Sequence, residues 1–351
     1  MMVGLGAAAS GQSQQAGDCP AIVQRALAQM QSLCQAAGRN QVCYANYAIN
    51  AIPQPNIRME PFNVGDSRDM TVFQSLQLSP LDEAAQQWGV ALLHVQANLP
   101  DTLPGQNATI LVFGDSELTP LPNAAGAMGQ AFQVRTRIGQ VSCSQTPTDG
   151  LIVQTPEGTR RVALTINGVD IQMGSTVFIR ANARTGMNLT TLRGAAYLHT
   201  RYGDTLVPEG AETNLPLDED YEVSGAAELP VPYDLDGVDG LPLDALDEPI
   251  DPADPMSDAE QAALYEALDS GSLDDLYTLM DTYETGDAWF DAGEVIGEPP
   301  DSIELSNQEI GGSDTGGSDT GSDGDTGNTA NDAPPDDPPP SDSGGGDDSG
   351  G

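Results

Sequence analysis

The charges of this chain are segregated along its length. All twelve basic residues are arginines, and the last of them is Arg201. Residues 1–201 also hold twelve acidic residues and so carry no formal net charge, whereas the remaining 41 Asp and Glu residues follow Arg201 with no base among them. Like charges at this density repel one another and resist compaction. The sequence therefore predicts one folded body in the neutral part and a tail that cannot be compact by itself.

The acidic excess also restricts the classes of partner. Binding to nucleic acid needs clustered Lys and Arg that neutralise phosphates, and adsorption to anionic lipid needs basic clusters as well. The sequence holds no apolar stretch approaching the ~20 residues of a membrane-spanning helix. We therefore expect no nucleic-acid partner and no membrane span, and the oligomeric state stays open.

The N-terminal segment and the cysteines bear on the compartment. Residues 1–17 begin with an apolar stretch rich in small residues, which fits a secretory signal remnant and equally a flexible N-terminus. An even number of cysteines fits two disulfides in any of three connectivities, although buried free thiols are the alternative. The four candidates for disulfides are Cys19, Cys34, Cys43 and Cys143. Together these features favour an extracellular or cell-envelope location.

Two regions of the neutral part have different periodicities. Residues 18–57 form a Cys-bearing helical segment, in which Pro20 and an apolar stripe at helical spacing predict a helix over about 20–37. Residues 58–217 alternate short apolar runs with turn residues. This pattern predicts a mainly β fold, an antiparallel β roll or sandwich that packs on the one N-terminal helix.

The strongest local signal is a hairpin centred on Asn167 and Gly168. Alternating apolar residues lead into this pair and out of it again. Asn-Gly accommodates positive φ angles at both central positions of a tight turn, so it is the residue pair that β-hairpins favour. We expect the next turn at Gly174 and Ser175.

Part of the chain resembles a known family. The run from Val162 to Ser175 (VALTINGVDIQMGS) resembles the opening hairpin of FecR-like domains. The segments 192–196 (LRGAA) and 207–210 (VPEG) resemble that family's later Leu-x-Gly-x-Ala and Val-x-x-Gly steps. The resemblance covers about residues 150–217. A Cys-bearing segment ahead of such a domain is also similar to the arrangement in uncharacterised secreted bacterial proteins.

The resemblance implies an extracytoplasmic β domain without catalysis. The best-known FecR-like proteins relay signals across a membrane to a sigma factor. The sequence contains neither the transmembrane helix nor the basic cytoplasmic segment of those proteins. We therefore carry over the fold and the compartment, and not the regulatory role.

The acidic part divides into three segments. Residues 218–256 are rich in Pro, Asp, Glu and Gly and predict an acidic linker. Residues 257–293 open with a capping box and predict short amphipathic helices, which need the body or a partner to stay ordered. Candidate partner anchors in this segment are Leu276, Tyr277, Met280, Trp289 and Phe290. The low-complexity acidic tail, 294–351, is expected to be disordered.

The sequence offers no convincing catalytic constellation. No GxSxG elbow accompanies either histidine, so we expect His94 and His199 to be packed or surface side chains. Asp115 and Glu117 are the best carboxylate pair in the body, but acidic residues in a turn after a strand are commonplace. We predict no catalytic residue, no bound cofactor and no structural metal site.

Calcium is the more serious cofactor candidate. Asp234, Asp236 and Asp239 place oxygen ligands at close spacing, but the run departs from the EF-hand pattern. Weak, charge-driven binding of divalent cations by the tail is expected, without a defined site.

These observations predict a non-catalytic extracytoplasmic binding or scaffold protein whose partner is a protein or another envelope macromolecule. A calcium-responsive cell-surface protein that acts through its acidic tail is the first alternative. A carboxylate-dependent hydrolase is the second.

Overall fold

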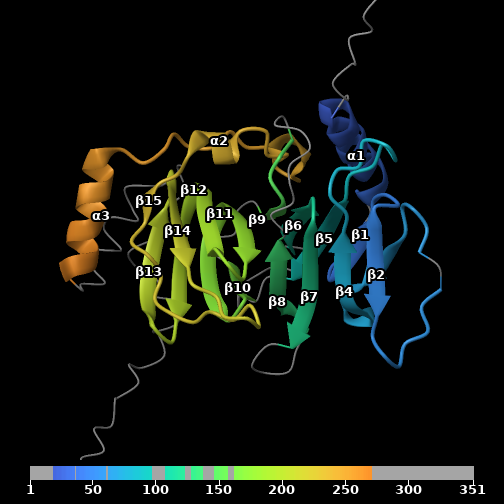
Figure 1. The fold of residues 1–351 in the computed structure, drawn as a ribbon, viewed down its shortest axis with the longest axis horizontal. Coiled ribbons are helices and arrows are strands. Elements are labelled where there is room, and N and C mark those ends of the chain that lie inside the picture. Colours follow the sequence, from blue (N-terminus) through green and yellow to red (C-terminus); the bar gives the residue numbers. More distant parts are fainter. Residues whose placement is uncertain are drawn as a thin grey trace, which may run out of the picture. The chain divides into compact units, whose positions relative to one another are not determined.

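The fold is mainly β with one N-terminal helix, which confirms the predicted fold class (Figure 1). Internal contacts divide the chain into two units, Met1–Val295 and Ile296–Gly351, and every described residue belongs to the first. The computed structural model describes residues 19–35, 37–60, 62–96, 107–122, 128–136, 146–156 and 162–270.

One curled sheet contains two sets of strands. In the first half-sheet the order is β3-β1-β5-β6-β9, and in the second half-sheet it is β2-β4-β7-β8-β10. Neighbouring strands within each half-sheet are antiparallel, except for the parallel pair β8 and β10. The bounds are β1 Gln41–Tyr44, β2 Ile49–Pro53, β3 Ser67–Asp69, β4 Phe73–Leu78, β5 Val90–Gln96, β6 Asn107–Phe113, β7 Ser116–Pro122, β8 Met128–Thr136, β9 Gly150–Gln154 and β10 Val162–Ile166. A short 3₁₀ turn, Met70–Val72, precedes β4.

Two long strands, β11 (Val169–Asn182) and β12 (Gly186–Thr200), pair with each other, and β11 joins the two half-sheets. The first part of β11 pairs with β10, whereas its residues 176–179 pair with β9. The register between β11 and β12 shifts after Thr176, and Ser175 and Gly194 have positive φ angles. Both strands bend at these residues, where β11 changes its partner from β10 to β9. The turn predicted at Gly174 and Ser175 is therefore wrong: the chain bends there within one continuous strand.

The sheet continues beyond β12. The β12 strand pairs with β13 (Gly203–Pro208) and with β14 (Ala211–Leu215), and β14 pairs with the two-residue strand β15 (Val231–Pro232). The hairpin between β10 and β11 turns at Asn167 and Gly168, which have φ angles of 53° and 77°. The predicted Asn-Gly turn is thus confirmed.

The main core gathers apolar side chains from both half-sheets. Every second residue of a strand faces the same side, so Ala91, Leu93 and Val95 of β5 all lie in this core. From the second half-sheet, Leu76 of β4 and Phe132 of β8 join the same cluster. The side of the first half-sheet that faces away from this core is called the outer face below.

The outer face is covered at one end by α1 (Cys19–Cys34). Ile22 and Met30 of the helix belong to the same buried cluster as Val90, Leu92 and Phe113 of the strands. A disulfide joins Cys34 to Cys43 of β1 and so ties the end of the helix to the sheet. Because two strands, β1 and β2, lie within residues 18–57, that segment is helical only in its first part.

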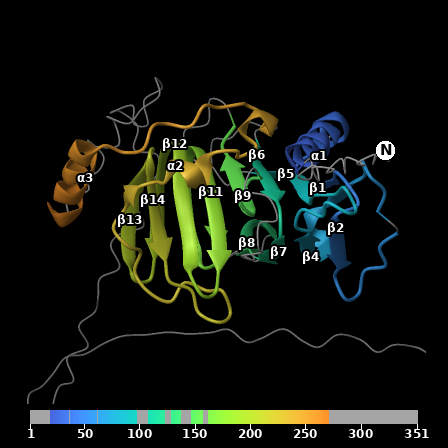
Figure 2. The ribbon, with the colours of Figure 1, turned by 45° about the horizontal axis from the view of Figure 1, so that its top comes forward.

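A second cover comes from the acidic part of the chain. Residues 233–256, called the strap below, run across the outer face instead of forming a free linker (Figure 2). Their apolar residues recur among the acids and prolines, and this gives the segment a side to bury. The buried side chains of the strap that join the outer cluster are Tyr233, Val238, Leu241, Leu243, Ala245 and Leu246. The strap carries α2 (Leu235–Val238) and the 3₁₀ turn Leu243–Ala245.

The last described element is α3 (Asp258–Ser270). Ser257 and Glu260 form the predicted capping box, in which the Glu260 carboxylate accepts from the Ser257 amide at 2.7 Å. Leu264 is fully buried in the main core cluster, and the Tyr265 hydroxyl donates to the carbonyl of Pro230. This helix therefore docks on the body. Within the described part of the chain, no helix combines the length and apolarity that crossing a bilayer requires.

Candidate functional site

The outer face carries a line of polar residues that crosses five strands. Gln41, His94, Thr109, Gln154 and Thr176 are direct cross-strand neighbours in turn, from β1 through β5, β6 and β9 to β11. In each strand the residue two positions away belongs to the apolar outer cluster, so these five polar side chains share its face. We call them the polar row. The strap crosses the sheet along this row.

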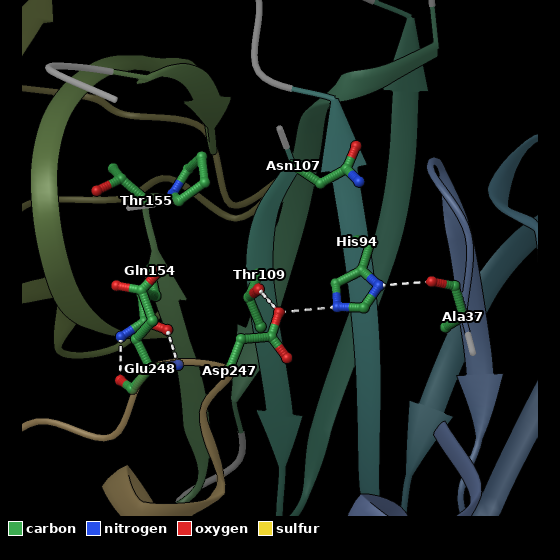
Figure 3. Close-up of a pocket in the computed structure, with 9 residues that line it drawn as sticks. Ala37, His94, Asn107, Thr109, Gln154, Thr155, Asp247 and Glu248 are labelled. Carbon is green, nitrogen blue, oxygen red and sulfur yellow. Dashed lines mark hydrogen bonds and ion pairs between the residues drawn. The ribbon is translucent and has the colours of Figure 1, made fainter. Parts of the chain in front are cut away.

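His94 holds the strap through a carboxylate. Its Nε2 lies 3.0 Å from Oδ2 of Asp247, and the hydroxyl of Thr109 donates to the same oxygen at 2.5 Å (Figure 3). The other ring nitrogen, Nδ1, lies 2.8 Å from the backbone oxygen of Ala37, just after α1. One histidine thus connects three segments that are far apart in the sequence.

The protonation of His94 follows from these two partners. A neutral imidazole has one N–H donor and one acceptor nitrogen, whereas both nitrogens donate in the protonated ring. Both oxygens that face His94 are acceptors, so the protonated ring satisfies both contacts. The hydrogen bond to Asp247 raises the pKa of His94, although burial of the ring opposes this. In turn, His94 lowers the pKa of Asp247 against the opposing effect of burial.

The neighbouring residue of the strap is held through its backbone. The side-chain amide of Gln154 accepts from the backbone N–H of Glu248 at 3.1 Å and donates to the backbone oxygen of Glu248 at 2.6 Å. Farther along the strap, Nε of Arg193 donates to the backbone oxygen of Asp251 at 2.7 Å. The sheet therefore recognises one acidic side chain together with an extended backbone.

A cavity of about 320 Å³ opens beside these contacts. Its lining comes from β5, β6 and the end of β9 on one side and from the strap on the other (Figure 3). The lining residues are Ala37, His94, Asn107, Thr109, Gln154, Thr155, Pro156, Asp247 and Glu248. The strap therefore leaves open space beside His94.

The side chains beside the cavity hold a carboxylate and the backbone of the next residue. Covalent catalysis needs a nucleophile within hydrogen-bond reach of a base, and the described residues that line the cavity include neither Ser nor Cys. Both nitrogens of His94 already have partners, so the ring has no free nitrogen to act as a base. The hydroxyl of Thr109 is committed to Asp247.

The other sequence predictions have separate outcomes. Cys34 and Cys43 form a disulfide, Cys19 is also disulfide-bonded, and Cys143 lies outside the described residues. The candidate partner anchors, the five residues between Leu276 and Phe290 named above, lie outside the described residues as well. His199 is an exposed side chain whose Nδ1 lies 2.6 Å from Oδ1 of Asp204.

The candidate acidic groups are not brought together as a site. The backbone of Asp115 donates to the carboxylate of Asp149, and the carboxylate of Glu117 accepts from the side-chain amide of Gln77 at 3.3 Å. Asp234 caps the N-terminus of α2 by accepting from the amide of Asp236. Within the described residues, no three His, Cys, Asp or Glu side chains are grouped so that they could hold a metal ion.

The sequence reasoning missed the central pair of this site. His94 and Asp247 are separated by 153 positions, and the carboxylate stands in a segment predicted to be a linker. The apolar residues Leu243 and Leu246, which stand among acids and prolines, were the one signal in the sequence that this segment packs its apolar side chains against the body. Comparison with protein-family models, with curated proteins and with solved structures finds no match to this chain.

Proposed function

We propose that this protein is a non-catalytic extracytoplasmic binding module whose binding surface is the polar row. The observation that carries the proposal is the mode in which the row holds the strap: His94 and Thr109 bind a carboxylate, while Gln154 binds the backbone of the next residue. This combination suits an extended acidic peptide. The strap is then an internal ligand that covers the surface in the isolated chain.

Two features of the strap support this interpretation. Pro249 and Pro252 restrict the backbone to extended conformations, so less conformational entropy is lost when the segment binds. An intramolecular segment also competes at a high effective concentration, on the order of millimolar for a short flexible connection. A separate peptide ligand can therefore bind only when the contacts of the strap are weakened or outcompeted.

The compartment is part of the proposal. The disulfide between Cys34 and Cys43 supports it, because disulfides persist in oxidising compartments and are rare in the cytosol. The FecR-like pattern of residues 150–217 implies the same location. As the partner we propose an envelope or extracellular protein that presents an extended acidic segment.

The test uses the full chain with Asp247→Ala, which removes the anchoring carboxylate of the strap. A fluorescein-labelled peptide with the sequence of residues 245–254 is titrated and followed by fluorescence anisotropy. We expect saturable binding that is at least tenfold tighter than to the unmodified chain, since a hydrogen bond to a charged group contributes about 1.5–3 kcal/mol.

The matched control is the double variant His94→Ala/Asp247→Ala, which should bind the peptide at least tenfold more weakly than the single variant. A peptide with Asn in place of its first Asp should lose the same factor. If the Asp247→Ala chain keeps its circular dichroism spectrum and shows no binding up to millimolar peptide, the polar row is not a peptide-binding surface.

A further inference from the structure

The contacts of the His94 ring depend on its protonation and affect how firmly the strap is held. The ring stands between the backbone oxygen of Ala37 and the carboxylate of Asp247, at 2.8 and 3.0 Å. After loss of one proton, the ring can donate to only one of these oxygens, and its bare nitrogen then faces a lone pair of the other. Deprotonation of His94 must therefore weaken its hydrogen bond either to Ala37 or to Asp247.

Of the two contacts of His94, the one with Asp247 joins the sheet to the strap. Asp247 is about half exposed, at 51% of its side-chain surface, so water can solvate it when this contact opens. His94 itself is only 12% exposed. Opening on the strap side thus costs less than moving Ala37, which is linked through the backbone to the disulfide-bonded end of α1.

The surroundings of His94 contain no competing cation among the described residues that line the cavity. The charged groups there are Asp247 and Glu248, both on the strap. The strands beside His94 contribute the neutral residues Gln41 and Thr109, and one strand farther out Asp69 of β3 is the cross-strand partner of Gln41. Asp69 already accepts from the amide and the hydroxyl of Thr71. A charge on His94 is therefore balanced by the strap.

We propose that His94 is a pH-sensitive clasp that closes the strap over the polar row when its ring is protonated and loosens it when the ring is neutral. As a control of ligand access, this rests on the binding surface proposed above, whereas the movement of the strap can be tested without any ligand. In an acidic medium the strap is held over the row; in a neutral or alkaline medium it is held less firmly.

The pH at which the strap is held most firmly follows from the raised pKa of His94 and the lowered pKa of Asp247. Asp247 supports the clasp above the ordinary pKa of 3.8, and this support is lost as the pH falls through its lowered value. His94 supports it fully below the ordinary pKa of 6.5, and this support is lost as the pH rises through its raised value. The strap is therefore held most firmly in mildly acidic solution.

The experiment measures backbone hydrogen exchange of the strap in the full chain between pH 5 and 9, corrected for the intrinsic rate at each pH. The reporters are the amide of Glu248, which donates to Gln154, and the amide of Ala253, which donates to the backbone oxygen of Leu192. We expect protection to fall about tenfold for each unit by which the pKa of His94 is raised. Amides in β11 and β12 should show no such change.

Two variants test whether His94 causes the pH dependence of exchange in the strap. His94→Gln cannot titrate, so its strap should exchange at a rate independent of pH after the same correction. His199→Gln removes the only other histidine and should leave the pH dependence intact, and it also assigns the remaining histidine signal in an NMR titration. Unchanged protection from pH 5 to 9, or the same loss in His94→Gln, would overturn the clasp.

These results stay separate from the test of the proposed function. A strap that loosens with pH while the peptide fails to bind Asp247→Ala would retain the clasp and reject the peptide surface. Peptide binding without pH-dependent exchange would do the reverse.

Discussion

Asp149 is a partly buried acid immediately before β9 whose surroundings disfavour its charge. Burial raises the pKa of Asp149 to about 6 from 3.8, and the nearby charge of Asp115 adds to this, while a hydrogen bond from the Asp115 backbone opposes it. The pKa of Asp149 is higher in the folded than in the unfolded chain, so its contribution to stability is most favourable below pH 3.8. This contribution is lost as the pH rises from 3.8 to about 6.

We predict that Asp149→Asn raises the free energy of unfolding by about 1–2 kcal/mol at pH 7.5, since each pKa unit corresponds to about 1.4 kcal/mol and partial exposure reduces the effect. At pH 3.5 the gain should vanish. Urea unfolding at both pH values measures this difference. Glu266→Gln, an exposed acid on α3, is the control and should change little. An equal effect of Asp149→Asn at both pH values would contradict the assignment.

Thr176 and Thr191 are two fully buried threonines near the bend of β11 and β12 that differ in one hydrogen bond. The hydroxyl of Thr191 donates to the backbone oxygen of Val207 at 2.9 Å, whereas that of Thr176 has no partner among the described residues. A buried hydroxyl without a partner costs free energy, and one that is paired contributes to stability.

Substitution of each threonine by the similarly shaped valine should therefore have opposite effects. We expect Thr176→Val to stabilise the fold by about 0.5–1 kcal/mol and Thr191→Val to destabilise it by about 1–2 kcal/mol. Thermal unfolding of the two variants beside the unmodified chain gives both values. Equal destabilisation would mean that Thr176 has a partner in solution.

At the scale of elements, the bend shared by β11 and β12 is what allows one sheet to enclose a core. Gly194 has a φ angle of 74° at this bend, and a Cβ atom there would meet the backbone oxygen of Gly174. Neither the strained φ nor the collision with backbone can be relieved by a side-chain movement. The same bend sets where β11 leaves β10 and joins β9.

Gly194→Ala should consequently destabilise the fold by about 2–4 kcal/mol, the range of a severe single-residue effect. Gly237→Ala in α2 is the matched control, because it has an ordinary φ angle and no atom near its Cβ position. That change should be neutral or slightly stabilising. Chemical denaturation of both variants provides the comparison, and a neutral Gly194→Ala would show that the bend tolerates a side chain.

At the scale of the whole molecule, the strap is a structural part of the body. Five large apolar residues of the strap cover outer-face side chains such as Leu111, Phe113 and Phe178. Full burial of one such side chain contributes about 1.5–3 kcal/mol, which is substantial beside a typical total stability of about 5–15 kcal/mol. The segment that the charge distribution assigns to the tail is therefore needed by the neutral part.

A chain truncated after Leu217 should expose this apolar face. We expect it to bind the dye ANS several-fold more strongly than the full chain and to unfold at a clearly lower temperature. A chain that ends at Ser270 keeps the strap and α3 and should match the full chain in both measurements. If the shorter chain is as stable as the longer one, the strap adds no structural support.

Local signals in the sequence predicted the elements that depend on near neighbours. The Asn167-Gly168 hairpin follows from the φ angles that its turn demands, the helix after Cys19 follows from its apolar spacing, and Ser257 with Glu260 forms the expected cap. The mainly β fold follows from the repeated alternation of apolar and polar residues. Each of these patterns lies within a short stretch of chain, where geometry links residue type directly to conformation.

Only the tertiary structure decided what the acidic part does beside the body. The charge segregation predicts that residues after Arg201 cannot condense alone, because like charges repel. It cannot show that the neutral part offers His94, Gln154 and Arg193 to the strap, since cross-strand registry brings these residues together from β5, β9 and β12. A pair such as His94 and Asp247 exists only after the sheet has formed, and so depends on contacts that no local pattern encodes.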